Sequence, residues 1–415
     1  MSDVQSDSAP IPYRHRLLGH PVELAGHVAA HGTLQLPRGR DTTWQQAFIA
    51  TLEASGLTGR GGGAFPAWAK VAMGARHGAG GTLVVNGMES EPASDKDKVL
   101  WTRSPHLVLD GAQLVAAACR SGAIVVCIPE GRDDIAAAAN RARHERAAYG
   151  YARVTETLVR PPARFVSGEE SALAQWIERE RALPVFRPDK STPLRIGRRA
   201  ALVHNTETLA HVALIARYGA GPFRARGTNE QPGTCLMTIK GAVSQPGVVE
   251  VDWGTPLRDI ARRATPRHAP SALLVGGYGG TWVPPAHFAT PYSSMALGAV
   301  GIPVGVGLMM VLGRTDCGLV ESAGIARFLA HESAGQCGPC TFGLPAIADD
   351  LALLANRRAD GGLLTRLHRR LDQVQGRGAC GHPDGAVGMA RSALKVFATD
   401  VTAHLRGDPC TAGSA

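Results

Sequence analysis

The spacing of apolar and polar residues divides the chain into stretches of three different textures. Residues 41–222 alternate helical patterns with short β-branched runs, such as TLVVN at 82–86 and AIVVCIP at 123–129. Short apolar runs separated by helical segments are typical of a sheet covered by helices. We therefore expect an α/β domain over residues 41–222, preceded by an N-terminal extension over residues 1–40. The first ten residues of this extension are mostly polar, and we expect them to be disordered.

The texture changes near residue 230. The pattern there predicts a strand, a turn with Gly and Pro, a second strand and a helix that begins near Thr255 and Pro256. These elements lie in the segment TCLMTIKGAVSQPGVVEVDWGTPLRDIARRA. This order predicts a small β-grasp module over residues 223–315. Beyond Gly313, segments such as LPAIADDLALLA and LLTRLHRRLDQV carry apolar residues at helical spacing. They predict a helical bundle over residues 316–415.

One segment, Ser293–Gly313, is uncharged over the length that a membrane helix needs. Several glycines and Pro303 interrupt it, which favours buried strands and tight turns, so we expect no membrane insertion. The N-terminus has no basic start followed by an apolar run, and the eight cysteines lack the dense spacing of a secreted scaffold. These features predict a cytoplasmic protein with reduced thiols.

The formal net charge of +9 comes mostly from arginines that are spread along the chain. Because no basic stripe with interleaved aromatic residues is present, we expect no binding to nucleic acid. An acidic protein partner suits the basic surface, since opposite charges speed the encounter of two proteins. A solvated surface without a partner explains the same charge equally well.

The segment GLTGRGGGAFPAWAK, at 56–70, places four glycines among the five residues 59–63. Glycines let the backbone adopt positive φ angles and let a ligand approach the loop amides closely. The loop lacks the Gly-Lys-Ser/Thr ending of a Walker loop and does not match the dinucleotide fingerprint. It therefore predicts a site for a phosphate or a flat ring, with a plain tight turn as the alternative.

Two further segments place carboxylates after predicted strands. Asn86, Glu89 and Glu91 follow the first strand, in VVNGMESEPASDKDK, and Gly168, Glu169 and Glu170 stand in FVSGEESALAQW. Carboxylates at the ends of parallel strands face the crevice where ligands bind in α/β folds. The alternative for each segment is a helix N-cap followed by acidic residues in the first turn.

Seven ordered segments carry a resemblance that covers nearly the whole chain from about residue 40. They are GRGGGAFP, NGMESEP, GEESAL, HNTETLA, GAVSQPGVVEV, GGYGGTW and ESAGQCGPC. Together they resemble the flavin-bearing, NADH-oxidising subunit of respiratory complex I and of bacterial NAD-reducing hydrogenases and formate dehydrogenases. The resemblance implies an oxidoreductase with an SLBB-like β-grasp module. It also implies FMN, an iron–sulfur cluster of the 4Fe-4S type, and ferredoxin-like or other electron-transfer subunits as partners in an assembly associated with a membrane.

The resemblance further implies that FMN lies between the glycine loop and the neighbouring strand ends. By motif position the cofactor would be held by Gly59, Arg60, Gly61, Gly62, Lys70, Asn86, Glu89, Ser90, Gly168, Glu169, Glu170, Asn205 and Thr208. Lys70 and the loop amides would supply positive potential for the anionic cofactor. The family carries an aspartate at the position of Met88 and a tyrosine at that of Phe165, so two polar contacts near the flavin are missing.

The contacts that the resemblance implies for NAD(H) are less complete. Phe65 and Glu91 occupy the family's positions for holding the nucleotide, and Glu91 is the predicted catalytic residue. The stacking phenylalanine that the family carries after the glycine loop is Met73 here, and Arg187 and Lys190 stand where another aromatic residue is expected. A cationic plane stacks on adenine, so these changes permit binding. They leave two electron donors open, NADH and reduced ferredoxin.

The segment HESAGQCGPCTFG, at 331–343, contains a C-x-x-C pair. The resemblance implies a set of four cysteine ligands, of which Cys337, Cys340 and Cys380 are present and the first is replaced by Ala334. Three thiolates suit a four-iron cluster with one other ligand, a three-iron cluster or a zinc ion. Buried thiols that bind no metal are the plain alternative.

We predict His382, two residues from Cys380, as the fourth ligand of this set. Cys410 lies beyond a helix of about twenty residues, which places it roughly 30 Å away at 1.5 Å per residue. Cys317 is also separated from Cys337 by a helical segment, so neither Cys317 nor Cys410 is a good candidate. Because three cysteines and one histidine suit zinc as well as iron, a non-catalytic scaffold with a structural zinc ion is a second functional hypothesis.

Overall fold

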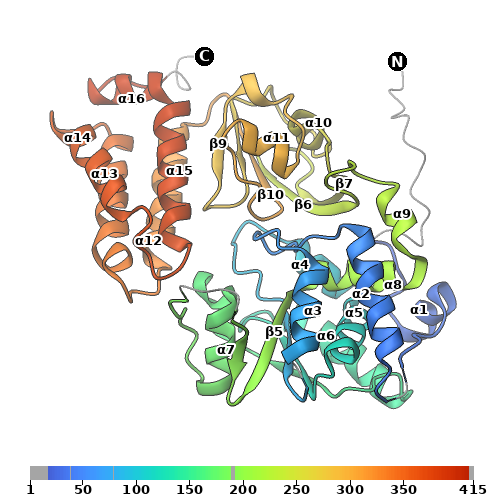
Figure 1. The fold of residues 1–415 in the computed structure, drawn as a ribbon. Helices are drawn as coiled ribbons and strands as arrows, with labels where there is room; N and C mark the ends of the chain where they lie inside the picture. Colours follow the sequence, from blue (N-terminus) through green and yellow to red (C-terminus); the bar gives the residue numbers. More distant parts are fainter. Residues whose placement is uncertain (1–16, 38, 78, 188–191, 411–415) are drawn as a thin grey trace, which may run out of the picture.

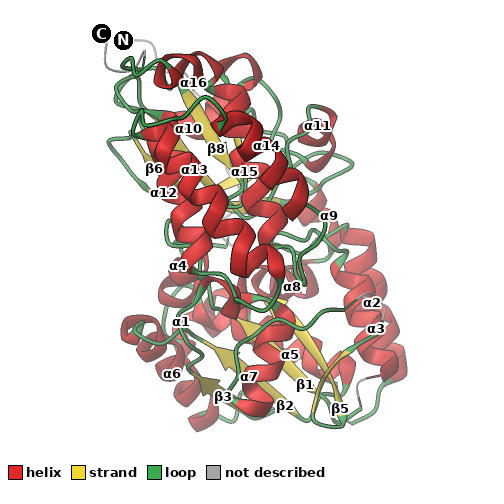
Figure 2. Cartoon of the chain, turned by 90° about the vertical axis from the view of Figure 1, so that its left-hand side faces the viewer, coloured by secondary structure: helices red, strands yellow, loops and turns green. Residues whose placement is uncertain are grey.

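The computed structural model describes residues 17–410 except residues 38, 78 and 188–191. The disorder expected for the first ten residues and the nucleotide contact expected at Lys190 lie outside the described residues. Figure 1 shows the first sheet and its helices in the lower half of the molecule and the second sheet above them. The helical bundle stands beside the second sheet and above α7, and Figure 2 looks onto this bundle.

The first sheet has the strand order β3-β2-β1-β5-β4. Its strands are β1 (Thr82–Asn86), β2 (Ala123–Cys127), β3 (Glu156–Val159), β4 (Leu194–Ile196) and β5 (Arg199–Asn205). All neighbours are parallel except β4, which pairs antiparallel with β5. The predicted strands at 82–86 and 123–127 are confirmed. Because Asn86 is in register with both Cys127 and Asn205, the carboxyl ends of three strands share one edge of the sheet.

Helices cover the two faces of this sheet unequally. They are α1 (Leu24–His31), α2 (Thr42–Ser55), α3 (Ala67–His77), α4 (Lys96–Arg103), α5 (Pro105–Cys119), α6 (Asp133–Ala148), the short 3-10 helix η2 (Phe165–Gly168), α7 (Glu170–Arg179), α8 (Thr206–Tyr218) and α9 (Ala220–Arg224). Leu83 and Val85 of β1 enter the main core, whereas Val84 enters a small second core that includes Leu173 of α7. This alternation follows from the two-residue repeat of a strand. The smaller cover on the α7 face leaves the sheet edge near η2 accessible to other segments.

The second sheet has the order β7-β6-β10-β8-β9, with β6 and β10 parallel and the other pairs antiparallel. Its elements are β6 (Thr234–Gly241), β7 (Gly247–Asp252), α10 (Leu257–Arg262), β8 (Ala272–Val275), β9 (Thr281–Val283), the 3-10 helix η3 (Pro285–His287), α11 (Ser294–Ala299) and β10 (Leu308–Leu312). The predicted order of strand, turn, strand and helix is confirmed. The uncharged segment before Gly313 contains α11 and β10, and among the described residues no helix is long and apolar enough to cross a membrane.

The C-terminal part is helical, as predicted. It contains α12 (Gly318–His331), the π-helix η4 (Pro339–Gly343), α13 (Leu344–Ala355), α14 (Leu363–Val374), α15 (His382–Val396) and α16 (Ala398–Leu405). The C-x-x-C pair lies between α12 and α13, also as predicted. The prediction of one long last helix is wrong, because the chain breaks at Phe397 between α15 and α16. Phe397 packs so tightly on Gly318 that a Cβ atom at Gly318 would lie 2.2 Å from the phenyl ring.

Candidate functional site

The glycine loop between α2 and α3 presents bare backbone to solvent. The amide of Gly59 donates to the carbonyl of Phe65 at 2.8 Å, which closes the loop, and residues 61–63 are exposed. Gly62 has a φ of 97°, a conformation that other residues rarely adopt. A Cβ atom on Gly61 would lie 3.4 Å from the Cβ of Asn205, at the carboxyl end of β5. The predicted loop and the predicted strand end therefore face each other.

Arg60 connects the same loop to the rest of the molecule. Its amide donates to the hydroxyl of Thr208 at 2.9 Å. Its side chain is 6% exposed, donates to the carbonyl of Thr234 at 3.0 Å and lies 5.0 Å from the ring centre of Trp253. The guanidinium group is thus directed towards the second sheet.

The segments that follow β1 and precede α7 meet at the same sheet edge. The side-chain amide of Asn86 donates to the carbonyl of Gly168 at 2.9 Å, and the hydroxyl of Ser90 donates to the carbonyl of Phe165 at 2.7 Å. Asn205 caps α8 by accepting from the amide of Glu207 at 2.9 Å. Three segments far apart in the sequence therefore meet at one sheet edge, which we call the crevice because such strand ends face the ligand crevice in α/β folds.

Two of the predicted carboxylates on this crevice have different surroundings. Glu169 accepts from the amides of Ser171 and Ala172, so it is the N-cap of α7, as the alternative to a ligand role predicted. Glu170 is the more exposed carboxylate and forms an ion pair with Lys70 of α3. This ion pair connects α3 to α7 and is partly exposed to solvent.

Glu89 is partly buried and turned towards α4. Its carboxylate accepts from the amides of Asp97 at 3.1 Å and Lys98 at 2.9 Å, and from the hydroxyl of Ser94. Burial, followed by the charge of Asp97, raises the pKa of Glu89 to about 7. In this structure the contacts of Glu89 are therefore with the start of α4.

Glu91 connects the crevice to the second sheet. Both carboxylate oxygens lie 3.2 Å from the amide of Tyr278. Gly277 has a φ of 93°, and a Cβ atom there would lie 2.7 Å from the Glu91 carboxylate, so the close approach requires glycine. Burial raises the pKa of Glu91 to about 7, although the hydrogen bond from Tyr278 opposes this shift. Phe65, the other predicted nucleotide contact, is 55% exposed.

The residues of the crevice fit a flat, polar and anionic cofactor. The exposed amides of residues 61–63 and the side chain of Lys70 offer positive potential without bulk. The hydroxyl of Ser167 and Nε2 of His204 are buried and have no hydrogen-bond partner among the described residues. Burial, followed by the charge of Lys70, lowers the pKa of His204 to about 3, which leaves its imidazole neutral.

The three predicted cysteines come together beyond the C-terminal end of α12. Cys340, on the π-helix η4, is 3% exposed. Burial, followed by the thiol of Cys337 and then that of Cys380, raises the pKa of Cys340 to about 12, so both thiols lie near Cys340. The backbone amide of Ala334 opposes this rise in the pKa of Cys340, so it lies close to the sulfur. Ala334 therefore lies beside the set whose first cysteine it replaces.

His382 lies next to this set. Its Nε2 donates to the carbonyl of Leu329 at 2.8 Å, which leaves the lone pair on the buried and unpartnered Nδ1. The backbone amide of His382 lies near the Cys380 sulfur, whose pKa it lowers against the larger effect of burial. The imidazole thus has, two residues from Cys380, a ring nitrogen without a partner among the described residues.

The spacing of these groups bears on the kind of metal they suit. Among the described residues, one group of three Cys, His or carboxylate ligand atoms lies within 4.8 Å, and it does not include Cys337, Cys340 or Cys380. A single zinc ion draws its ligands to about 2.3 Å from one centre, whereas each thiolate of a four-iron cluster binds a different iron atom. The wider spacing of the predicted set therefore suits a cluster better than a single ion.

One short segment joins the crevice to the cysteine set. The ring of Phe165 lies 5.3 Å from the ring of His382, measured between centroids, and its amide donates to the carboxylate of Glu332 at 3.0 Å. The carboxylate of Glu169 is close enough to contribute to the raised pKa of Cys380, for which burial is the largest cause. Residues 164–170 therefore have the predicted flavin site on one side and the cysteines on the other.

Sequence reasoning missed a second group of ligand-type side chains. The group that lies within 4.8 Å consists of Cys317, His404 and Cys410, at the opposite end of α12. Cys317 and His404 are 87 positions apart, so no spacing motif pointed to them. The only signal in the sequence was that Cys317 and Cys410 are cysteines to which the family pattern assigns no role.

Comparisons with known proteins agree with this arrangement. Residues 52–214 match the Nuo51 FMN-binding domain, and residues 321–404 match the NADH-ubiquinone oxidoreductase-F iron-sulfur binding region. An NADH-quinone oxidoreductase subunit of Streptomyces coelicolor is 29% identical over 384 residues, which are 87% of this chain and 84% of that protein. The corresponding subunit of Rhizobium meliloti is 27% identical over 381 residues, which are 87% of this chain and 89% of that protein.

A solved structure shows the same fold. The NAD⁺-reducing [NiFe]-hydrogenase in the H₂-reduced state aligns with 87% of this chain at a TM-score of 0.79 and 30% identity. This chain spans 62% of the length of that hydrogenase chain. The two domain matches confirm the predicted oxidoreductase class and the predicted cofactors, FMN and an iron–sulfur cluster. The chain belongs to the family of flavin-bearing, NADH-binding subunits of NADH-quinone oxidoreductases and related enzymes.

Proposed function

We propose that this chain is the electron-input subunit of a complex I-like oxidoreductase, in which it takes electrons from NADH and passes them to partner subunits. The observation that carries this proposal is the double contact of residues 164–170. They contact the crevice through Gly168 and Phe165, while on the other side the ring of Phe165 packs against His382 and the charge of Glu169 contributes to the raised pKa of Cys380. A site that accepts an electron pair and a site that transfers single electrons need to be this close for efficient transfer.

In this proposal the crevice holds FMN, which supplies hydride acceptance and release of single electrons when it is bound. The exposed amides of residues 61–63 and the amine of Lys70 would bind its anionic part. Asn86 and Asn205, which are in register on β1 and β5, would orient its polar edge. Glu169 acts by positioning, since it caps α7 and fixes the backbone of Gly168.

We assign NADH as the electron donor. The family and the structural relative support a nicotinamide nucleotide, and no comparison supports reduced ferredoxin as the donor or a scaffold with structural zinc as the function. Glu91 would hold the nucleotide, because the amide of Tyr278 fixes its carboxylate at the boundary between the crevice and the second sheet. Met73 replaces an aromatic contact, so we expect binding of NADH to be weaker than in a chain that has this contact.

We further propose that Cys337, Cys340 and Cys380 hold a four-iron cluster whose fourth position is taken by His382 or by solvent. Their mutual proximity and the unpaired Nδ1 of His382 support this ligand set. The second sheet supports an SLBB-like β-grasp module, because its central strands β6 and β10 are parallel and α10 follows the β6–β7 hairpin. The partners would be electron-transfer subunits of the assembly.

The experiment that tests the flavin site is Gly61→Val in the full chain. A Cβ atom added at Gly61 would lie 3.4 Å from the Cβ of Asn205. The larger side chain of valine should therefore obstruct the crevice and remove most of the FMN. Gly247→Val is the matched control, because a Cβ atom there has nothing within 4 Å. FMN per chain is measured by absorbance of the purified proteins, and reduction of the flavin is followed after addition of NADH. Unchanged FMN in Gly61→Val would remove the loop from the site, and a bound flavin that NADH does not bleach would contradict the assigned donor.

A further inference from the structure

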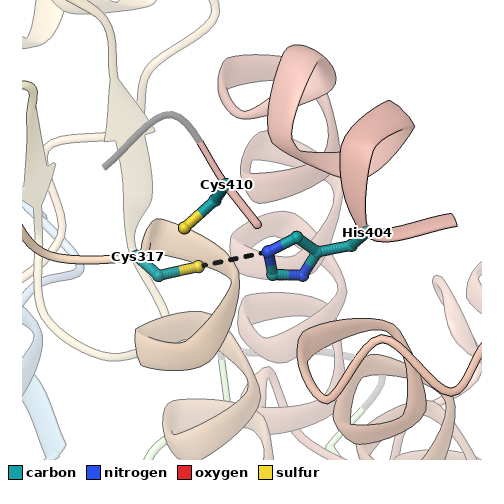
Figure 3. A group of neighbouring side chains, drawn as sticks. All are labelled: Cys317, His404 and Cys410. Carbon is teal, nitrogen blue, oxygen red and sulfur yellow. Dashed lines mark hydrogen bonds between the residues drawn. The ribbon is translucent and has the colours of Figure 1, made fainter. Parts of the chain in front are cut away.

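Three ligand-type side chains converge at the N-terminal end of α12. Cys317 is the N-cap residue of α12, His404 lies in the last turn of α16, and Cys410 follows that helix. The Cys317 sulfur lies 3.9 Å from Nε2 of His404, and the three ligand atoms are all within 4.8 Å of one another. Figure 3 shows the two thiols and the imidazole directed towards a common point.

The hydrogen bond of His404 determines which ring nitrogen carries the lone pair. Its Nδ1 lies 3.0 Å from the carbonyl of Leu354, in a buried environment. A carbonyl only accepts, so Nδ1 carries the proton and donates. Nε2 therefore directs its lone pair at the thiols. A backbone carbonyl that orients the imidazole through its other nitrogen is the usual second layer around a metal-binding histidine.

We propose that Cys317, His404 and Cys410 bind one zinc ion. Thiolate and imidazole donors select zinc over magnesium or calcium, which prefer oxygen ligands. Tetrahedral bonds of about 2.3 Å to sulfur and about 2.0 Å to nitrogen separate a sulfur and a nitrogen ligand by about 3.6 Å, and two sulfurs by about 3.8 Å. The observed 3.9 Å between Cys317 and His404 needs only a small closure. Cys317 is partly exposed, so water can occupy the fourth position.

The ion would cross-link the last described residues, up to Cys410, to the start of α12. Cys317 lies between the end of β10 and the start of α12, whereas His404 and Cys410 belong to the C-terminal segment. One ion would therefore join the second sheet, the first helix of the bundle and the last helix. A cross-link between segments so distant in the sequence restricts the unfolded chain more than the folded one, so the ion should stabilise the protein. This inference does not depend on the proposed function.

The site is tested by metal binding to the full-length chain that carries Cys337→Ala, Cys340→Ala and Cys380→Ala, which removes the other thiols of the bundle. Reduced apoprotein is titrated with Co²⁺ and then with Zn²⁺ under anaerobic conditions. We expect one equivalent of Co²⁺ with the visible absorption of a tetrahedral ion and a thiolate charge-transfer band, and we expect Zn²⁺ to displace it. Cys410→Ser or His404→Gln in the same background should weaken binding at least tenfold. Cys119→Ser, at a buried thiol in the first domain that contacts the carbonyl of Val71, should leave binding unchanged.

A second measurement tests the same site if the triple variant does not fold. Zinc and iron per chain are determined in the otherwise unaltered protein and in Cys410→Ser, both purified without oxygen. Loss of zinc with retention of iron supports the site. The proposal is overturned by equal zinc in the two proteins, or by absence of tetrahedral cobalt absorption from a folded triple variant. It is also overturned if thiol titration finds Cys317 and Cys410 joined as a disulfide in protein kept reduced.

Discussion

The two ends of α12 carry two groups of cysteines that differ in geometry. The C-terminal end leads to Cys337, Cys340 and Cys380, which lie near one another but do not form a group of ligand atoms within 4.8 Å. The N-terminal end has Cys317, which converges with a second thiol and an imidazole within 4.8 Å. The 14 residues of α12, a helix about 21 Å long, lie between the two groups.

The difference shows how the spacing of donor atoms distinguishes two kinds of metal site. A cluster distributes its ligands over several iron atoms, so its thiolates stay apart and are supported by backbone amides, such as that of Ala334 on Cys340. A single ion requires all its ligands at one centre, and the buried His404 meets this requirement with a lone pair held in place by Leu354. The number of cysteines alone would not have separated the two groups.

The largest effect should come from Cys340→Ser. Cys340 is 3% exposed and lies between Cys337 and Cys380, so its loss should remove nearly all of the iron. Zinc at the other end of α12 should stay, because none of its ligands changes. Iron and zinc per chain are measured by elemental analysis after anaerobic purification, with Cys119→Ser as the control. Full retention of iron would show that this group does not hold the cluster.

The converse change is Cys410→Ser. It should remove zinc, leave iron unchanged and lower the midpoint of thermal unfolding by at least about 3 °C, since about 1 kcal/mol corresponds to roughly 2–4 °C in a large domain. A chelator that removes zinc from the unaltered protein should lower the midpoint by a similar amount. An identical midpoint in the variant, with zinc still bound, would break the distinction between the two ends of α12.

Ala334→Cys should complete the four-thiolate pattern at the C-terminal end of α12. The backbone of Ala334 already contacts Cys340, so a thiol at this position is close to the other ligands. An anionic ligand in place of a neutral one should lower the reduction potential and slow the loss of iron in air. Ser333→Cys is the control, because it adds a thiol one position out of the pattern. If both variants lose iron at the same rate, the loop of this chain does not follow the course of the family's loop.

His382→Ala should have a smaller effect on iron than Cys340→Ser. The imidazole is a neutral ligand, and the three thiolates remain. We expect a lower iron content, since Nδ1 is the unpaired atom beside the set. His331→Ala, whose side chain is 81% exposed at the same end of α12, controls for loss of a histidine. Iron that is fully retained in His382→Ala would indicate an open coordination position in place of the imidazole.

The smallest expected effect is a change of protein stability with pH that arises from Glu91, at the crevice. Burial raises the pKa of Glu91 from 4.5 to about 7, so between these pH values the folded state binds more protons than the unfolded state. The contribution of Glu91 to stability therefore falls as the pH rises through this window. Glu91→Gln should raise the unfolding midpoint relative to the unaltered chain at pH 8 but not at pH 4. Glu53→Gln, at an exposed position of α2, should show no such difference, and equal shifts at both pH values would contradict the buried state of Glu91.

Much of the fold and of the first site followed from the sequence because the signals are local. The run at 82–86 formed β1, and the order of elements from β6 to α10 was correct. The glycine loop, Asn86 and Gly168 were found from short motifs, and parallel pairing of β1 with β5 brings Asn86 and Asn205 to one edge. Strand ends meet in this way whenever neighbouring strands are parallel, so the crevice could be anticipated.

Other features of the site depended on tertiary contacts. Glu89 and Glu91 are two residues apart, yet Glu89 contacts the start of α4 and Glu91 contacts Tyr278 in the second domain. The side chain of Arg60 likewise lies against Trp253 instead of facing the exposed glycines. Each direction is determined by packing between domains, which leaves no trace in a local motif.

The sequence was enough to predict the first α/β domain, the C-terminal helices, the glycine loop and the C-x-x-C segment, because each depends on residues that are neighbours in the chain or repeat with a regular period. The proximity of Cys317 and Cys410 depends on the folded chain. The apolar period continues through Phe397, so the sequence predicted one long helix that carried Cys410 away. In the folded chain Phe397 packs against Gly318, next to Cys317, and the helix breaks there. This contact joins residues that are far apart in the chain, and it turns α16 so that His404 and Cys410 reach Cys317.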